Sequence, residues 1–277
     1  MSAVRSVLVG TCGLLLLTSC AGGVPKATTV RRSAPVATAS QSTPPPVSVE
    51  VGKSYVEVLA SGTGVGAMRE GLKLTAPNSV AYQYLDHTAN MQEASIDEGG
   101  MPYRKEAVVP VGDGSFKYCN PDKFSCVTFG GFKVNQDGKL VDLTVNNEPL
   151  GPRLTMGNGQ PVTAAGAKFT LLTAYQSVMS NTLFITVKVQ TGAEPITINP
   201  KYWSYVGSDG KLARPAGSSD ATHVVSKASL IVIVSFEWVK PGGRLTVGGC
   251  RVLGSSAPGD ESRDCPGAAF SAVLKVG

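Results

Sequence analysis

The spacing of apolar positions changes along this sequence, and each spacing predicts a different element. Shortly after Pro77, apolar side chains recur every three or four residues, which places them on one face of a helix. Ser79 is a residue type that caps helix N-termini, so the helix is expected to begin there. The positions on its apolar face are Val80, Ala81, Tyr84, Leu85, Thr88 and Met91.

After Gly99-Gly100 the pattern changes to short runs typical of β-strands. Asp137-Gly138 stands between two of these runs, and this dipeptide between apolar segments indicates a hairpin. The predicted strands of this segment are 107–111, 116–119, 126–134 and 139–145. A helical segment followed by antiparallel strands predicts a small α+β domain.

The second half of the sequence contains apolar runs with the two-residue alternation of strands. Aliphatic side chains occupy every second position from Leu183 to Val189, which predicts a strand with one buried face. The run 230–238 is almost continuously apolar, which predicts a central strand between two sheets. Further strands are predicted at 169–175, 196–198, 202–206, 244–250 and 269–276. So many short strands predict an antiparallel sandwich.

The N-terminus carries a separate apolar run, Val7–Leu17. It is too short to cross a bilayer, which needs roughly 20 residues, and it matches the hydrophobic part of a secretory signal. The next residues complete Leu17-Thr18-Ser19-Cys20, which resembles the lipobox of bacterial lipoproteins. The resemblance implies that Cys20 receives a diacylglyceryl group on its thiol and becomes the first residue of the mature chain. The alternatives are an ordinary signal peptide cleaved near Ala21 and a retained transmembrane helix.

Two fatty acyl chains on one cysteine hold a protein stably, whereas one chain holds it only marginally. The resemblance therefore implies an extracytoplasmic protein, anchored to the cell membrane through lipid on Cys20. The following residues are rich in Ala, Thr, Ser, Val and Pro and predict a disordered tether. The expected organisation is a signal peptide over 1–19, a tether over 20–50, an α+β domain over 51–160 and a sandwich over 161–277.

The order of elements carries two further resemblances. A helix followed by a curled antiparallel sheet resembles the NTF2-like (cystatin-like) fold, and the later strands resemble the immunoglobulin-like domains of bacterial surface lipoproteins. These likenesses imply a mainly β protein, with a small α+β domain followed by an immunoglobulin-like antiparallel sandwich. They concern architecture and imply no activity.

Composition agrees with this fold class. Hydrophobic residues make up 42% of the chain and charged residues only 16%, and 32 Gly with 18 Pro favour many turns over long helices. The formal net charge is +5, and no basic run is interleaved with aromatic residues. The sequence therefore predicts no nucleic-acid binding.

The six cysteines separate by position. Cys12 leaves with the signal and Cys20 takes the lipid, so four remain in the exported body: Cys119, Cys126, Cys250 and Cys265. An even number outside the cytoplasm predicts two disulfides, and local pairs are favoured because each pair brackets turn-forming residues. The alternative is a zinc site, but neither pair has the CxxC spacing that zinc favours. No metal and no cofactor is therefore expected.

Residues that bear catalytic chemistry are sparse. The chain has two histidines, His87 and His223, and no Gly-x-Ser-x-Gly nucleophile motif. Gly62–Ala67 fits the GxGxxA pattern after a strand-like stretch, Tyr55–Leu59, but no βαβ unit surrounds it, which favours a turn over a dinucleotide site.

A group of aromatic residues around His87 is the remaining candidate for a ligand pocket, although the same residues could simply fill a core. The expected pocket residues are Tyr84, His87, Phe116, Tyr118, Phe129 and Phe132. The sequence therefore favours a non-catalytic binding or interaction module of the cell envelope, whose partner is an envelope protein, the cell wall or a small apolar ligand. The alternative is a hydrolase that uses His87 with a carboxylate in the first domain.

Overall fold

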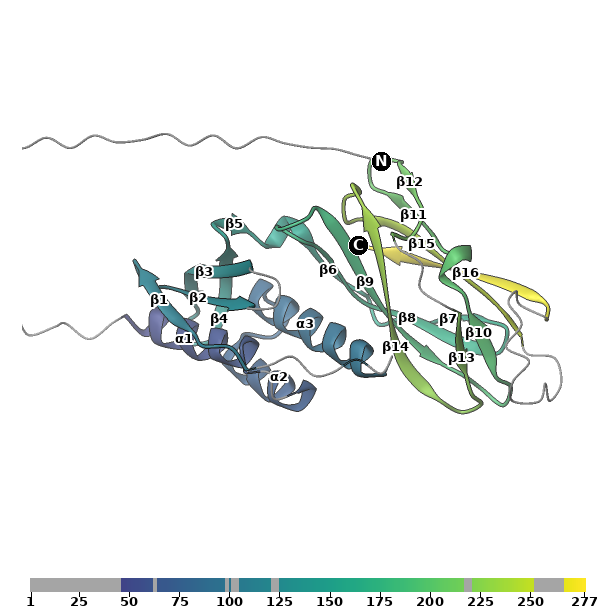
Figure 1. The fold of residues 1–277 in the computed structure, drawn as a ribbon, viewed down its shortest axis with the longest axis horizontal. Helices are drawn as coiled ribbons and strands as arrows, with labels where there is room; N and C mark the ends of the chain where they lie inside the picture. The colour runs from purple at the N-terminus through teal and green to yellow at the C-terminus, as the bar shows by residue number, and fades with distance from the viewer. Residues whose placement is uncertain are drawn as a thin grey trace, which may run out of the picture. The chain divides into compact units, whose positions relative to one another are not determined.

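The computed structural model describes residues 46–61, 64–97, 100, 105–120, 125–216, 221–251 and 267–277. These residues belong to one compact unit, Pro44–Gly277, in which a small α+β region precedes a β-sandwich (Figure 1). The predicted fold class, mainly β with an α+β region followed by an antiparallel sandwich, is confirmed. The NTF2-like and immunoglobulin-like resemblances stay predictions that rest on element order.

The α+β region packs helices against an antiparallel sheet whose strands follow one another in the order β1-β2-β3-β4-β5 (Figure 1). Helix α1 contacts β3, and α3 contacts β4. The elements are α1 (Val47–Leu59), α2 (Val65–Gly71), the 3-10 turn η1 (Leu72–Leu74), α3 (Val80–Asp97), β1 (Val109–Gly112), β2 (Ser115–Asn120), β3 (Ser125–Val134), β4 (Leu140–Val145) and β5 (Glu148–Pro149).

The local sequence explains where α3 begins and where the β3–β4 hairpin turns. The Ser79 hydroxyl accepts a hydrogen bond from the backbone N–H of Tyr82 at 3.2 Å, which satisfies a donor of the first helical turn. In the hairpin, the Asn135 side chain accepts bonds from the N–H groups of Asp137 and Lys139. Gly138 adopts φ 70°, a conformation that suits glycine. The predicted helix and hairpin are confirmed.

The strand-like interpretation of Tyr55–Leu59 is wrong, because this stretch is the end of α1. Tyr55, Val56 and Leu59 are buried together, and their spacing is that of a helix face. The helix begins at Val47, inside the segment expected to be a tether, whereas residues 20–45 of that segment lie outside the described residues.

The sandwich contains two antiparallel sheets. One has the order β14-β9-β8-β6, with β7 also paired to β8, and the other has the order β12-β11-β15-β10-β13, with β16 also paired to β15. The elements are η2 (Gly151–Arg153), β6 (Leu154–Met156), β7 (Val162–Ala164), β8 (Ala167–Gln176), β9 (Thr182–Gln190), β10 (Ile196–Ile198), η3 (Pro200–Tyr202), β11 (Ser204–Gly207), β12 (Leu212–Ala213), β13 (Thr222–Val224), β14 (Ser229–Glu237), β15 (Gly243–Arg251) and β16 (Ala269–Val276).

Side chains of both sheets form the sandwich core. Tyr205 of β11, Trp203 just before it, and Phe169 and Phe236 of the other sheet are completely buried in it. The alternation predicted for β9 is confirmed, since its aliphatic residues from Leu183 to Val189 all belong to this core. Strand β6 comes from the segment expected to form the first domain, yet it pairs with β8 of the sandwich.

The predicted central position of 230–238 is wrong, because β14 lies at the end of its sheet order and pairs with β9. Its apolar character has another cause. Val232, Val234 and Phe236 face the sandwich core, while α3 packs against β14 from the other side, where Ile231 is also buried. A strand covered on both faces needs apolar residues on both faces, wherever it stands in the sheet.

Candidate functional site

His87 lies on the side of α3 that contacts β8, and it takes part in a buried polar column. Its Nδ1 is 2.8 Å from the Thr173 hydroxyl oxygen, which is 2.7 Å from the hydroxyl oxygen of Thr186 on β9. All three side chains are buried, and the His87 ring meets Tyr175 edge-on with centroids 5.5 Å apart. The Thr186 hydroxyl also accepts a hydrogen bond from the backbone N–H of Thr173 and donates one to its backbone carbonyl. These contacts lie next to a β-bulge between Leu171 and Thr173.

Burial decides the charge of His87. Desolvation lowers its pKa from 6.5 to about 3, because an imidazolium in this position would lose its hydration. The ring is therefore neutral at ordinary pH, and its Nδ1 meets the uncharged hydroxyl group of Thr173. Within the described residues its hydrogen-bond partner is Thr173, and no carboxylate bonds to it. A general base oriented by a carboxylate needs a different arrangement.

Asp86, the neighbour of His87, points into a second polar cluster. Arg69 of α2 forms ion pairs with Asp86 and Glu93, the latter at 3.1 Å, and its Nη2 donates to the side-chain Oδ1 of Asn90 at 2.6 Å. Asn90 is almost completely buried, and its amide nitrogen donates to the Asp86 carboxylate at 3.3 Å. Asp86, Asn90 and Glu93 follow one face of α3, so a single arginine connects α2 to three positions of α3.

This Arg69 cluster lines a cleft of about 390 Å³ between the helices and the sandwich. The opposite wall comes from β8, Lys188 of β9 and the first residues of β14. This cleft was not predicted from the sequence. The spacing of Asp86, Asn90 and Glu93 was a visible signal of a polar helix face, but nothing local to the sequence identifies Arg69 as their partner.

The aromatic residues expected to line a pocket lie in or against the hydrophobic core of the α+β region. Phe129 is central, since Tyr118 stacks on it at 5.5 Å and Tyr84 contacts it at 6.3 Å, while Phe116 and Phe132 form a separate pair. Burial raises the pKa of Tyr84 well above its usual value. His87 instead faces the sandwich. The structure thus brings five of the six residues together, and their ligand-binding role stays a prediction.

A groove beside the α+β core involves one of these residues. Phe116, Val49 and Val108 are among the side chains that line it, between the start of α1 and the β1–β2 hairpin. Its volume is about 670 Å³. The walls combine apolar side chains with Glu50 and Lys53 of α1.

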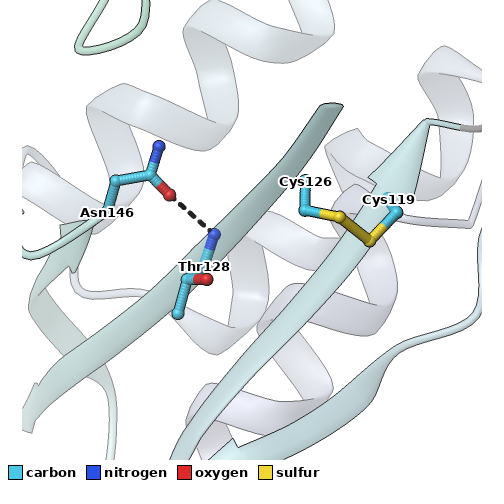
Figure 2. Close-up of a disulfide and its surroundings, with 4 residues drawn as sticks. All are labelled: Cys119, Cys126, Thr128 and Asn146. Atoms are coloured by element: carbon cyan, nitrogen blue, oxygen red, sulfur yellow. Dashed lines mark hydrogen bonds between the residues drawn. A yellow bond between two sulfur atoms is a disulfide. The ribbon is translucent and has the colours of Figure 1, made fainter. Parts of the chain in front are cut away.

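A disulfide joins Cys119 and Cys126, which lie directly opposite each other on β2 and β3 (Figure 2). Next to it, the Asn146 side chain accepts a hydrogen bond from the backbone N–H of Thr128 at 2.9 Å, so β3 is held from both sides (Figure 2). This predicted local pair is confirmed. Cys250 is also disulfide-bonded, whereas Cys265, its expected partner, and Cys20 lie outside the described residues.

The other candidate groups are simple to place. His223 is an exposed residue of β13. The described residues contain no cluster of three or more His, Cys, Asp or Glu side chains able to hold a metal ion. Within the same part of the chain, no helix combines the length and the apolar character needed to cross a membrane.

The described residues define a mainly β protein with a small α+β region and an antiparallel sandwich. No protein-family model matches the sequence, and no curated protein matches it. Among solved structures, the yjhA protein of Bacillus subtilis matches over 43% of this chain and 97% of its own, with 16% identity and a TM-score of 0.29.

A second solved structure is the ycdA protein of Bacillus subtilis subsp. subtilis strain 168, described as a candidate lipoprotein. It matches over 42% of this chain and 38% of its own, with 13% identity and a TM-score of 0.28. Likenesses at these TM-scores assign neither a family nor an activity to this chain.

Proposed function

We propose that this protein is a lipoprotein, anchored through Cys20 to the outer side of the cell membrane, whose folded body is a non-catalytic binding module of the cell envelope. The observation that carries the proposal is the tetrapeptide Leu17-Thr18-Ser19-Cys20 at the end of a short apolar run. Only a thiol can form the thioether to diacylglycerol, so a cysteine is required at this position.

The disulfides support an address outside the cytoplasm. Cys119 and Cys126 are joined, and Cys250 is disulfide-bonded as well. Reducing systems keep most cytosolic thiols free, whereas exported domains retain such bonds.

The histidines support a binding role over the hydrolase alternative. The imidazole of His87 faces the hydroxyl of Thr173, and Asp86 is engaged by Arg69 on another side of the helix. A hydrolase would need the imidazole directed at a carboxylate and at an open substrate space. The clefts beside Arg69 and Phe116 offer concave surfaces to a partner instead.

The anchor can be tested with Cys20→Ala, using Cys12→Ala in the same N-terminal segment as the matched control. Wild type and Cys12→Ala should incorporate labelled palmitate and enter the detergent phase, and the mature N-terminal peptide should begin at modified Cys20. Cys20→Ala should take up no label and leave the detergent phase. Two results would contradict the proposal. One is palmitate incorporation by Cys20→Ala; the other is a wild-type protein whose N-terminal peptide still contains Arg5 and an unmodified Cys20.

A further inference from the structure

The outer face of the sheet that contains β15 carries a row of aligned side chains from four strands. Val206 of β11 pairs with Leu212 of β12 on one side and with Arg244 of β15 on the other. Arg244 pairs in turn with Lys275 of β16. Paired residues of antiparallel strands point to the same face, and the neighbouring row that includes Tyr205 is buried in the core. The row from Leu212 to Lys275 therefore faces outward.

Other exposed residues extend this row. Val273 of β16 pairs with Thr246 on the same face and is 52% exposed, and Leu212 is 59% exposed. Tyr202 lies over Gly248, where a Cβ atom would come within 2.7 Å of the Cβ of Tyr202, and the Lys201 ammonium group stands 5.1 Å from the Tyr202 ring centre. Arg244, Lys275 and Lys201 thus share one surface with the apolar groups of Leu212, Val273 and Tyr202. This surface is called here the cationic face.

The charge of the cationic face has one sign. The six strands of this sheet contain Arg244, Arg251 and Lys275 and not one Asp or Glu. Arg251 lies opposite the core-facing Ile196, off the cationic face, and forms an ion pair with Glu194 at 3.8 Å. Asp209 lies in the β11–β12 turn, where its carboxylate accepts the backbone N–H of Lys211. No strand of this sheet therefore places a carboxylate on the cationic face within the part of the chain that the structure describes.

Trp238 lies at the rim of this face, beside the β11–β12 turn. Its carbonyl oxygen accepts a hydrogen bond from the Lys211 ammonium group at 3.2 Å, and Tyr205 reaches the Lys240 carbonyl at 2.9 Å. The side chain of Trp238 is 66% exposed, although its backbone has φ 59°, a conformation unfavourable for a bulky residue. Folding alone gains little from an exposed aromatic side chain on a strained backbone, which makes Trp238 a candidate for a binding role.

We propose that the cationic face, with Trp238 at its rim, binds the surface of an anionic lipid bilayer. Arg244, Lys275 and Lys201 match phosphate headgroups, which attract basic residues close to the membrane surface. Trp238, Tyr202 and Leu212 match the boundary below the headgroups, where aromatic and aliphatic side chains are favoured. An acidic protein would satisfy the cations but would leave no reason for the exposed apolar groups on the same face.

The cationic face would be the part of the folded body that contacts the membrane to which Cys20 is anchored. Its physiological role therefore rests on the proposed lipid anchor. The test does not depend on the anchor, because it uses the mature chain, residues 20–277, with Cys20→Ala and therefore without a covalently attached lipid. Binding is measured by sedimentation with vesicles of 30% phosphatidylglycerol in phosphatidylcholine and with vesicles of phosphatidylcholine alone. We expect binding to the anionic vesicles only, and its loss when salt screens the charges.

Two double variants distinguish binding by the cationic face from a general effect of the protein's net charge. Arg244→Gln with Lys275→Gln should lower the partition coefficient at least tenfold, since each cation near the surface strengthens binding several-fold. Lys117→Gln with Lys168→Gln, on other sheets, removes the same charge and should change it less than twofold. Far-ultraviolet circular dichroism shows whether the variants remain folded.

Tryptophan fluorescence gives an independent readout. The chain has two tryptophans, and Trp203 is fully buried with its indole N–H bonded to the Gly248 carbonyl, so a change on binding reports Trp238. Anionic vesicles should shift the emission to shorter wavelength and protect it from iodide, and Trp238→Ser should abolish both effects. Equal binding to neutral vesicles, equal loss in the two double variants, or no change in fluorescence would overturn the proposal. Capture of an acidic envelope protein without vesicle binding would also overturn it.

Discussion

The buried imidazole of His87 makes acid stability the sharpest test of the structure. The perturbation is a shift from pH 7 to pH 4.5. In the unfolded chain His87 takes up a proton near pH 6.5, whereas in the folded protein burial lowers its pKa to about 3. Between these two values the unfolded state binds one more proton than the folded state, so stability falls as the pH falls.

The size of the effect follows from the two pKa values. Each pH unit below 6.5 costs about 1.4 kcal/mol of unfolding free energy until the folded pKa is reached. At pH 4.5 the loss relative to pH 7 is about 2.5 kcal/mol, a large part of the stability of an ordinary domain. The loss is complete near pH 3, where the folded protein is protonated as well.

Urea unfolding at both pH values, on three proteins, isolates this contribution. His87→Asn places an uncharged polar group near the Thr173 hydroxyl and cannot titrate, and His223→Asn removes the chain's other histidine from an exposed strand. Wild type and His223→Asn should each lose about 2.5 kcal/mol more than His87→Asn does. Any loss of stability that is common to the three proteins cancels in this comparison. If all three lose stability in parallel, His87 is not a buried neutral residue and the reasoning fails.

Three further predictions concern stability alone. Gly157→Ala should cost at least about 2 kcal/mol in urea unfolding, because the new Cβ would lie 1.8 Å from the backbone oxygen of Leu171, whereas Gly66→Ala, with open space around it, should be neutral or stabilising. Cys119→Ser with Cys126→Ser should lower the unfolding free energy by about 2.5 kcal/mol, the loop entropy of a short closed hairpin, and an unchanged urea midpoint would contradict this. Gln92→Met should raise stability by roughly 1–3 kcal/mol, because within the described part of the chain neither amide atom of this buried residue has a hydrogen-bond partner. Gln83→Met, which removes a bond to the Asn78 carbonyl, should bring no such gain.

Elements whose signals are local could be predicted from the sequence. The Ser79 cap, the Asp137-Gly138 turn and the alternation in β9 each depend on residues close together in the chain. The errors came from burial by distant segments. Tyr55–Leu59 is too short for strand and helix periods to be told apart, and β14 is apolar on both faces because α3 covers one of them.

The candidate sites were less accessible to sequence reasoning, because their contacts are non-local. His87 was singled out for its rarity, but its partner Thr173 lies 86 residues away and carries no motif. The contacts of Arg69 could not be predicted either. Its three partners on α3 form a recognisable polar helix face, but no motif near Arg69 links it to that face. The Cys119–Cys126 pair was predictable because turn-forming residues bring its two ends together.

The two outer faces of the sandwich differ in a way that bears on where a partner binds. On the β14-β9-β8-β6 sheet, α3 covers part of the outer face, and hydroxyl groups and a neutral imidazole satisfy the polar atoms there. On the β15 sheet, Leu212 and Val273 stay exposed on the same face as the neighbouring cations Arg244 and Lys275. If this second face were only exposed to solvent, side chains of both charges and small polar side chains would favour solubility more than aliphatic groups and cations do. This composition is the reason why we propose an anionic bilayer, which offers both charge and an apolar phase, as the partner of this face.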